Sequence, residues 1–327
     1  MASALSAKFF HDEASAYEWL EGVLWPEGPV CAHCGCTGRI SALPPVRGSK
    51  SKKNPEGAIR YGLKRCGDCK KQFTVTVGTV FERSHVALNL WLQATHLLCS
   101  SKKGMSSHQI SRILGVTYRT AWFMTHRLRE AMRDGKLGPL GGPNTVVEAD
   151  ETYVGGKDKN RHASKRVGVR GGSAKEAVVS LVERGGRVRS HHVPEVSAKT
   201  LRPILMDQID AATHIMTDES KVYPAATKGF AGHSAVNHGI GEYVRGGGFI
   251  HSNTVESYFA TLKRGIVGTY HHVSPQHLKR YVGEFDFRHN ERSALGVGDA
   301  ERTQTALRGI VGKRLTYRDS SGLGATA

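Results

Sequence analysis

HSNTVESYFATLKR, residues 251–264, predicts an amphipathic helix with charged groups on its outer side. No proline or glycine interrupts it, and its apolar residues recur at the i, i+4, i+7 spacing of one helical face: Val255, Phe259 and Leu262. Glu256 and Lys263 are about two helical turns apart, so they lie on nearly the same side, away from part of the apolar stripe. A carboxylate and an ammonium group therefore share one surface of this helix.

Two short apolar runs upstream of this helix each end in an aspartate. Residues 146–150 read VVEAD and residues 214–218 read HIMTD. Runs of this kind predict buried strands. Three carboxylates on two strand ends and one helix can hold a pair of divalent ions. Asp150, Asp218 and Glu256 are therefore the candidate Mg²⁺ or Mn²⁺ ligands of a phosphoryl-transfer site.

The chemistry of phosphodiester transfer explains why these residue types matter. One metal makes the attacking water or 3′-hydroxyl more acidic, and a second, about 3.5 to 4 Å away, stabilises the leaving oxygen. Magnesium and manganese favour carboxylate oxygens, and strands hold ligands more rigidly than loops. Glu256 is preferred as the third ligand because of its charge. Asn253 is the alternative, since an amide carbonyl also binds magnesium.

The composition predicts a folded protein that binds a polyanion. The chain has 327 residues, 39% of them hydrophobic, which is enough for two or three domains with real cores. A formal net charge of +17 favours nucleic acid as the partner, without separating DNA from RNA. No apolar run is long enough for a membrane span, and the first ten residues lack the pattern of a signal peptide. We therefore expect a cytoplasmic protein.

Four of the six cysteines form two Cys-x-x-Cys knuckles: Cys31, Cys34, Cys66 and Cys69. Four thiolates in two such turns fit tetrahedral zinc, which would organise a segment with too little apolar content to fold alone. A redox pair is the less favoured interpretation, because it needs one such motif beside a βαβ unit. His33 and Cys36 are spare donors that we leave outside the zinc shell.

Residues 106–129 have the layout of a helix-turn-helix. The first helix is predicted to end at Gly115, and Thr117 is predicted to cap the second. The second helix is the one expected to meet DNA, with these candidate contacts: Tyr118, Arg119, Arg127 and Arg129. A plain helical hairpin is the alternative, since the match rests on one glycine turn.

A basic loop follows the strand that ends at Asp150. Lys157, Lys165 and Arg166 are its candidate contacts to the phosphate backbone, and a solvated loop is the alternative. On the strand itself, Glu148 shares the face of Asp150 while Glu151 points the other way. We expect both glutamates to be solvated or salt-bridged rather than metal-bound.

The order of elements after residue 144 predicts a mixed sheet. Three strands, a helix, a strand and then the carboxylate-bearing helix form the element order of the ribonuclease-H-like fold. The whole chain is expected to be a multidomain α+β protein. Its parts are an N-terminal helix (1–30), a zinc ribbon (31–82), a helix-turn-helix segment (83–134), a linker (135–144), a ribonuclease-H-like α/β catalytic domain (145–313) and a tail (314–327).

Three blocks of sequence carry a family resemblance: EADETYVGGK at 148–157, TDESKVY at 217–223 and NTVESYFATLKRG at 253–265. They resemble the catalytic blocks of DDE transposases of bacterial insertion sequences, and more narrowly the group with an N-terminal zinc ribbon. The resemblance covers nearly the whole chain, both cysteine knuckles included. It implies that Asp150, Asp218 and Glu256 bind metal and that Lys263 contacts DNA near the cleaved phosphate. Members with asparagine in the third acidic position favour Asn253.

The expected function is therefore metal-dependent DNA transposition. The zinc ribbon and helix-turn-helix would hold the terminal repeats of double-stranded DNA, helped by Lys263 and Arg264. The catalytic domain would cut with water and join the 3′-hydroxyl to target DNA, in a complex that is at least dimeric. The alternatives are a DNA-binding regulator with an inactive catalytic domain and a nuclease that only hydrolyses. The presence of all three acids disfavours the first, and strand joining would separate the second.

Overall fold

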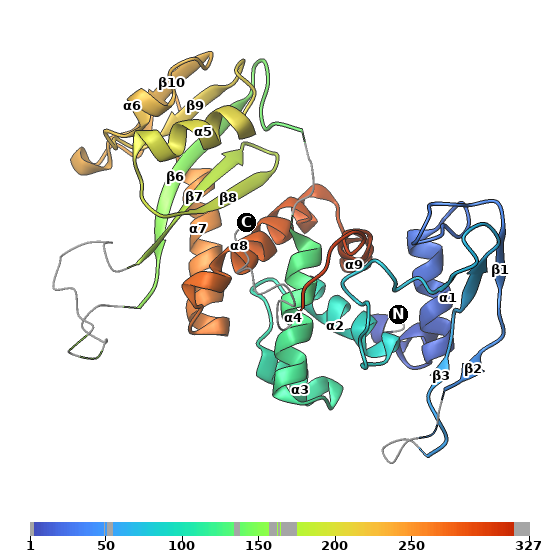
Figure 1. The fold of residues 1–327 in the computed structure, drawn as a ribbon. Helices are drawn as coiled ribbons and strands as arrows, with labels where there is room; N and C mark the ends of the chain where they lie inside the picture. Colours follow the sequence, from blue (N-terminus) through green and yellow to red (C-terminus); the bar gives the residue numbers. More distant parts are fainter. Residues whose placement is uncertain are drawn as a thin grey trace. The chain divides into compact units, whose positions relative to one another are not determined.

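The protein is described by a computed structural model that covers residues 3–48, 50, 55–133, 138–156, 162, 164 and 175–316. It divides into two compact units, Met1–Met132 with Gly296–Ala327, and Arg133–Leu295. Figure 1 traces the elements of both units along the chain. No helix in the described ranges is long and apolar enough to cross a membrane.

The first unit contains a helical core built around α2 (Leu88–Ser100). The helix α1 (Glu13–Leu24) begins at Asp12, whose carboxylate accepts the backbone amide of Ser15 at 2.8 Å. The last helix, α9 (Asp299–Arg308), packs on α1, α2 and α4 (Tyr118–Met132). The lead-in helix predicted within residues 1–30 is thus present.

The position of α9 differs from the expected domain layout. The catalytic domain was expected to run to residue 313, whereas the second unit ends at Leu295. The physical reason is that α9 buries its inner face on α2. Arg302 donates to the Cys99 carbonyl at 3.0 Å, and the Thr303 hydroxyl lies 3.3 Å from a His96 ring nitrogen.

The cysteine segment forms small antiparallel sheets. One contains β1 (Ile40–Ala42), β4 (Lys64–Cys66) and β5 (Gln72–Phe73), and the other contains β2 (Val46–Arg47) and β3 (Ile59–Arg60). The last of these strands, β5, ends at Phe73. The chain then turns, and the Val77 amide donates to the Thr74 carbonyl at 3.1 Å.

Two helices occupy the predicted helix-turn-helix positions. The first, α3 (Ser107–Leu114), ends at Gly115, whose left-handed φ of 64° favours glycine. The Thr117 hydroxyl then accepts the Thr120 amide at 3.2 Å, as expected of a helix cap at the start of α4. The role of this pair in binding DNA stays a prediction.

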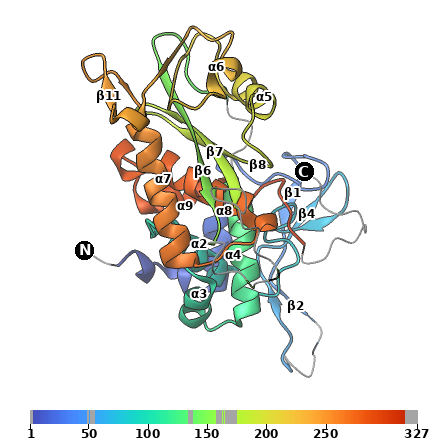
Figure 2. The same ribbon diagram turned by 90° about the vertical axis from the view of Figure 1, so that its left-hand side faces the viewer.

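The second unit is built on a five-stranded mixed sheet in the order β10-β9-β6-β7-β8, which is labelled in Figure 1; Figure 2 shows β6, β7 and β8 from a second side. The strands β6 (Val146–Val154), β7 (Glu176–Glu183) and β8 (Val188–Val193) form an antiparallel meander. After α5 (Ala198–Gln208), β9 (His214–Thr217) and β10 (Gly232–Ala235) run parallel to β6. The predicted order of strands, helix and strand is therefore correct.

Further elements of this unit follow β9. They are α6 (Tyr223–Ala226), the hairpin of β11 (Val244–Arg245) and β12 (Ile250–His251), α7 (Asn253–Gly265) with a π-helical turn (Ile266–Tyr270), and α8 (Pro275–Asn290). The helix predicted from residues 251–264 is α7.

The two faces of the sheet pack against different helices. Val147 and Ala149 of β6 share a core with α5 and α6, whereas Val154 shares a core with α7 and α8. The predicted apolar stripe of α7 is buried in that second core. Because alternate strand residues point to opposite faces, Glu148 and Asp150 lie on the side of the sheet that α7 covers.

Candidate active site

The sheet brings Asp150 and Asp218 side by side. Glu148 of β6 pairs with Met216 of the parallel neighbour β9, and continuing this register places Asp150 opposite Asp218. Their carboxylates accept nearby backbone amides, from Glu151 at 2.7 Å and from Ser220 at 3.1 Å. Asp218 directly follows β9, whereas Asp150 lies in the middle of β6, which continues to Val154 and does not end at Asp150 as expected, because β7 pairs with it along that length.

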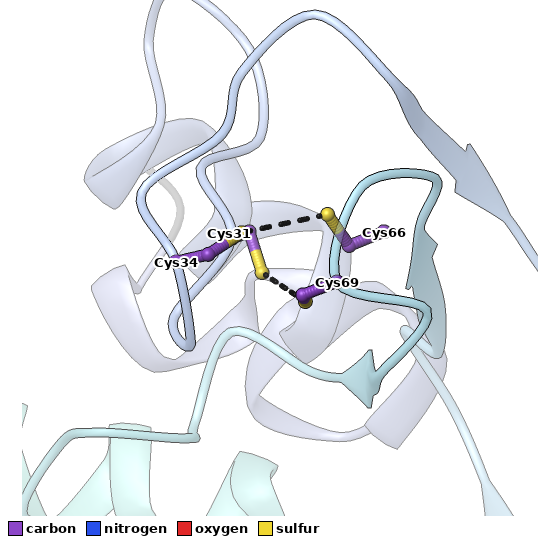
Figure 3. A group of neighbouring side chains, drawn as sticks. All are labelled: Cys31, Cys34, Cys66 and Cys69. Carbon is purple, nitrogen blue, oxygen red and sulfur yellow. Dashed lines mark hydrogen bonds between the residues drawn. The ribbon is translucent and has the colours of Figure 1, made fainter.

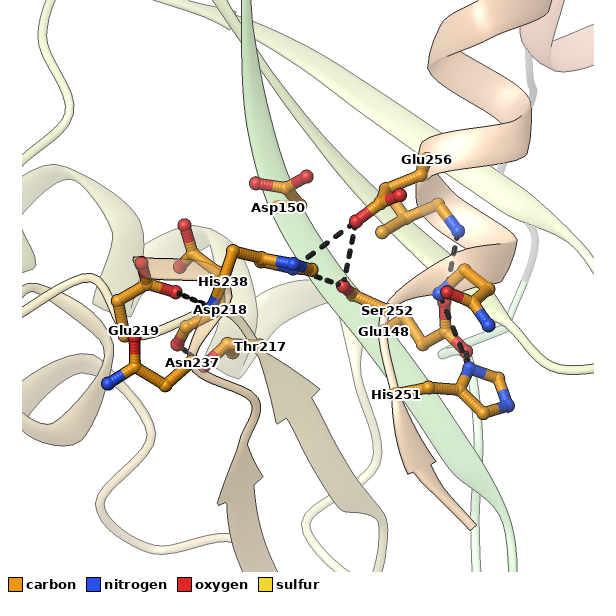
Figure 4. Close-up of polar contacts among 12 residues, drawn as sticks. Glu148, Asp150, Thr217, Asp218, Glu219, Asn237, His238, His251, Ser252 and Glu256 are labelled. Atoms are coloured by element: carbon orange, nitrogen blue, oxygen red, sulfur yellow. Dashed lines mark hydrogen bonds and ion pairs between the residues drawn. The ribbon is translucent and has the colours of Figure 1, made fainter. Parts of the chain in front are cut away.

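The third carboxylate, Glu256, comes from the first turn of α7. Figure 4 shows its carboxylate pointing toward Asp150 and His238. Burial, the charge of Asp218 and those of Glu151 and Glu256 together raise the pKa of Asp150 to about 8. Burial also raises the pKa of Asp218. The site is therefore a cluster of like charges in which the two aspartates are partly buried and Glu256 is exposed.

Such a cluster needs cations. In the described part of the chain, neither Asp150 nor Asp218 forms an ion pair with lysine or arginine. The oxygens of these aspartates and Glu256 do not all lie within 4.8 Å of one another, so the three carboxylates do not form a single preformed ligand group. The donor set, all hard oxygen, fits magnesium or manganese.

The competing third ligand, Asn253, is the first residue of α7. Its backbone amide lies 3.3 Å from Nδ1 of His251. One helical turn further on, Oε1 of Glu256 accepts the Ser252 hydroxyl at 3.2 Å and lies 3.3 Å from Nε2 of His238. The charge of Glu256 contributes to the raised pKa of Asp150, so this carboxylate is within electrostatic reach of the first aspartate.

His238 is a neighbour of the acidic cluster that sequence reasoning missed. It lies in a short 3₁₀ helix (His238–Ile240), where its backbone amide donates to Oε2 of Glu219 at 2.9 Å. Its ring contacts Glu256 and Ser252. The segment around it has no periodic pattern, so nothing distinguished this histidine from the sixteen others. It joins the segment after Asp218 to the start of α7.

Of the two glutamates beside Asp150, which we expected to be solvated or salt-bridged, Glu148 forms a salt bridge and Glu151 is hydrogen-bonded to a tyrosine. Glu148 is fully buried and pairs with Arg184 at 2.6 Å. Glu151 faces the opposite side of the sheet, as predicted, where its carboxylate accepts the Tyr223 hydroxyl at 2.7 Å. Burial raises the pKa of Glu151. Neither side chain is a free surface charge.

Lys263 and Arg264 are exposed on the last turn of α7. Arg264 donates to the Ala260 carbonyl at 3.0 Å, which leaves its outer edge available. The predicted contacts of the basic loop, Lys157, Lys165 and Arg166, lie outside the described residues.

Two predicted DNA contacts of α4 are corrected by the structure. Arg127 donates to the carbonyls of Glu82 and Leu315, and Arg129 is fully buried and donates to the Thr125 hydroxyl at 3.2 Å. The physical reason is that the second half of α4 is covered on nearly all sides, so guanidinium groups there bond to the protein itself. These two arginines are removed from the candidate DNA contacts.

The exposed start of α4 keeps the other candidates. Tyr118 is exposed and stacks on the ring of His108 with centroids 4.2 Å apart, and Arg119 is exposed. Both belong to the first turn after the Thr117 cap. Any DNA-binding surface on this helix is therefore at its N-terminal end.

The predicted zinc ligands do come together. The sulfurs of Cys31, Cys34, Cys66 and Cys69 all lie within 4.8 Å of one another (Figure 3). The separations of 3.7 Å (Cys31 to Cys69) and 3.6 Å (Cys34 to Cys66) match the roughly 3.8 Å expected for tetrahedral ligands about 2.3 Å from zinc. Backbone hydrogen bonding, chiefly from the Cys69 amide, lowers the pKa of Cys66 and favours its thiolate, whereas contact with the other cysteine thiols raises the pKa of Cys34. The cluster suits a structural zinc ion, with Cys36 outside the four-sulfur group.

Comparison with known proteins gives the family. The profile of the ISXO2-like transposase domain matches residues 139–290. A protein of the transposable element ISH50 of Halobacterium salinarum is 30% identical over 299 residues, which cover 86% of this chain and 92% of that protein.

Two solved structures are more distant. The Mos1 transposase paired-end complex with left transposon end has 13% identity and a TM-score of 0.26, over 67% of this chain and 74% of that one. A pre-cleavage Mos1 transpososome has 12% identity and a TM-score of 0.16, over 60% and 78%. These scores are too low to carry a structural argument. On the sequence relationship alone, the chain belongs to the ISXO2-like family of insertion-sequence transposases.

Proposed function

We propose that the protein is a DDE-type transposase that cuts the ends of its insertion sequence and joins the freed 3′-hydroxyl to target DNA. The observation that carries this proposal is the cluster of Asp150, Asp218 and Glu256, in which burial, followed by the neighbouring negative charges, raises the pKa of Asp150 to about 8. In a transposase, a cluster of carboxylates can hold the divalent metal ions that phosphoryl transfer requires. The strand order and directions of the sheet support a ribonuclease-H-like fold for this unit.

Asp150, Asp218 and Glu256 would hold two Mg²⁺ or Mn²⁺ ions, with Asn253 as the alternative third ligand. When bound, the ions make the attacking oxygen more acidic and stabilise the leaving oxygen. The residues of the chain supply the geometry. The paired strands fix both aspartates, and Lys263, two turns beyond Glu256, would contact the DNA phosphates next to the cleaved one.

The remaining contacts would bring double-stranded DNA to this site. Tyr118 and Arg119 on α4 and the zinc ribbon would bind the terminal repeats, while Lys263, Arg264 and the basic loop would bind the backbone near the cut. The formal net charge of +17 supports a polyanionic partner. Joining two ends requires at least two copies of the protein in the active complex.

The test is cleavage and strand transfer on a labelled duplex that carries the neighbouring terminal repeat, with Mg²⁺ or Mn²⁺. We expect joined products with the wild type and none with Asp150→Ala, Asp218→Ala or Glu256→Ala. Loss with Asn253→Ala but not Glu256→Ala would move the third ligand. Cut but unjoined DNA would indicate a nuclease, and tight binding without cleavage under either metal would indicate a regulator.

A further inference from the structure

Glu148, a carboxylate outside the acidic cluster, caps the helix that carries Glu256. Its Oε2 accepts the backbone amides of Thr254 at 2.8 Å and Val255 at 3.0 Å, and its Oε1 accepts the Thr254 hydroxyl at 2.9 Å. The first amides of a helix have no partner within the helix and carry partial positive charge. A fully buried carboxylate from β6 therefore satisfies the start of α7.

The residue that would ordinarily cap α7 does not do so. Ser252 occupies the N-cap position, but its hydroxyl makes no cap hydrogen bond. It donates instead to Glu256 and contacts His238. Glu148, more than one hundred residues earlier in the chain, caps the helix in place of Ser252. This long-range cap ties the helix to the sheet, which a local serine cap would not do.

Arg184 balances the charge of Glu148 and extends the same connection. Its Nε donates to Oε1 of Glu148 at 2.6 Å, while its two Nη groups donate to the carbonyls of Phe249 at 2.6 Å and His251 at 2.8 Å. These carbonyls belong to the hairpin segment that leads into α7. The pair of Glu148 and Arg184 therefore fixes both the approach to α7 and its first turn.

The contact between Glu148 and the start of α7 also determines where Glu256 lies relative to Asp150. Glu148 and Asp150 stand on the same face of one strand, and Glu256 follows the capped amides by less than one turn. Apolar packing also holds α7 on the sheet, but it is non-directional and permits the helix to slide or rotate. Hydrogen bonds to two successive amides do not permit this, because they demand defined distances and angles.

We propose that Glu148 is a positioning residue that holds Glu256 opposite Asp150, so that one strand sets the spacing between the first and third metal-binding carboxylates. This role rests on the proposed function, since it concerns the metal site of the same reaction. Glu148 does not bind the ions. It acts through the backbone of α7, much as an outer hydrogen-bond partner orients a direct metal ligand.

The test compares wild type with Glu148→Gln, which keeps the shape of the side chain and removes its charge. Mn²⁺ binding to the zinc-loaded protein on the terminal-repeat duplex is measured by the electron paramagnetic resonance of free Mn²⁺. Hydrogen exchange of residues 253–260 is measured in parallel. We expect Mn²⁺ affinity and cleavage rate to fall about 10- to 100-fold, as when a group that orients a metal ligand is removed. Exchange in the first turn of α7 should become faster.

Glu284→Gln is the matched control. Glu284 is equally buried, accepts the Tyr270 hydroxyl at 2.6 Å and pairs with Arg288 on the same helix. This substitution removes a buried charge from the same unit without touching the first turn of α7. It should lower thermal stability while leaving Mn²⁺ affinity at the wild-type value. A fall in Mn²⁺ affinity as large as that of Glu148→Gln would attribute the effect to general destabilisation and overturn the inference.

The remaining outcomes separate the two proposals. Wild-type protein that neither binds Mn²⁺ nor cleaves would overturn the proposed function and this role with it. Wild-type cleavage together with unchanged Mn²⁺ affinity and exchange in Glu148→Gln would overturn only the positioning role. If the glutamine variant does not fold, Glu148→Asp decides, because it keeps the charge beside Arg184 but is too short to reach both amides. It should fold and bind Mn²⁺ more weakly, and wild-type affinity would contradict the role.

Discussion

Neutralising Asp150 should stabilise the protein in the absence of magnesium and manganese, and only at high pH. The pKa of this carboxyl rises from 3.8 to about 8 on folding, because it is buried beside Asp218. Because the pKa is higher in the folded state than in the unfolded state, protonation of Asp150 favours folding, and this contribution is fully present below the unfolded pKa. That contribution is lost as the pH rises through the folded value. Asp150→Asn replaces the ionisable carboxyl group with a neutral amide, so the variant does not lose this stabilisation at high pH.

The magnitude follows from the two pKa values. Ionising this carboxyl at about pH 8 would cost at most about 6 kcal/mol of folding free energy, at about 1.4 kcal/mol for each pKa unit. Water entering the charged cluster reduces this cost, so we expect Asp150→Asn to gain about 2 kcal/mol at about pH 8. At about pH 4 the gain should be near zero, because the native carboxyl is already protonated there.

The assay is urea denaturation of the zinc-loaded protein without added divalent metal, since a chelator would also strip the cysteine cluster. Unfolding is followed by circular dichroism, because all four tryptophans lie in the first unit: Trp19, Trp25, Trp91 and Trp122. The exposed Asp207→Asn serves as control and should change stability at neither pH. Equal stabilisation by Asp150→Asn at both pH values would refute the reasoning, and so would its absence at high pH.

Three further predictions concern other parts of the chain. Cys66→Ser should lower the zinc content of the protein, measured by atomic emission, and unfold the ribbon segment, detected as faster hydrogen exchange. Full zinc content with unchanged exchange would exclude the four-sulfur site. Arg119→Ala should weaken DNA binding and reduce the salt dependence by about one phosphate contact, whereas Arg129→Ala should lower the melting temperature and leave that slope unchanged. His238→Ala should slow DNA cleavage about tenfold or more by releasing Glu256, with terminal-repeat affinity intact; an unchanged single-turnover rate would show that the contact is dispensable.

Much of the second unit could be predicted from local patterns. The spacing of Val255, Phe259 and Leu262 located α7 and its buried side, because a helix shows its inner face every three to four residues. The apolar runs ending at Asp150 and Asp218 located neighbouring strands, because buried strands of a mixed sheet read as short apolar segments. The parallel register then brings the two aspartates together.

Other features depended on contacts far apart in the sequence. From the sequence, Arg127 and Arg129 are expected to form one basic helical surface. In the structure α9, near the end of the chain, packs on α4, and the local sequence pattern of α4 cannot predict this contact. The cap from Glu148 spans more than one hundred residues. His238 sits in an irregular segment whose position is set by Glu219 and by Ser252. The burial of the two arginines, the cap from Glu148 and the position of His238 all depend on tertiary contacts, so no local sequence pattern predicts them.

The most direct test of the central claim is a crystal structure of the protein with its terminal-repeat duplex and Mn²⁺, in which anomalous scattering locates the ions. We predict two Mn²⁺ ions about 3.5 to 4 Å apart, bound by Asp150, Asp218 and Glu256. Both should be absent from an Asp150→Asn crystal grown in the same way. Mn²⁺ bound by Asn253 in place of Glu256 would reassign the third ligand, and a cluster without Mn²⁺ in the wild-type complex would contradict the account.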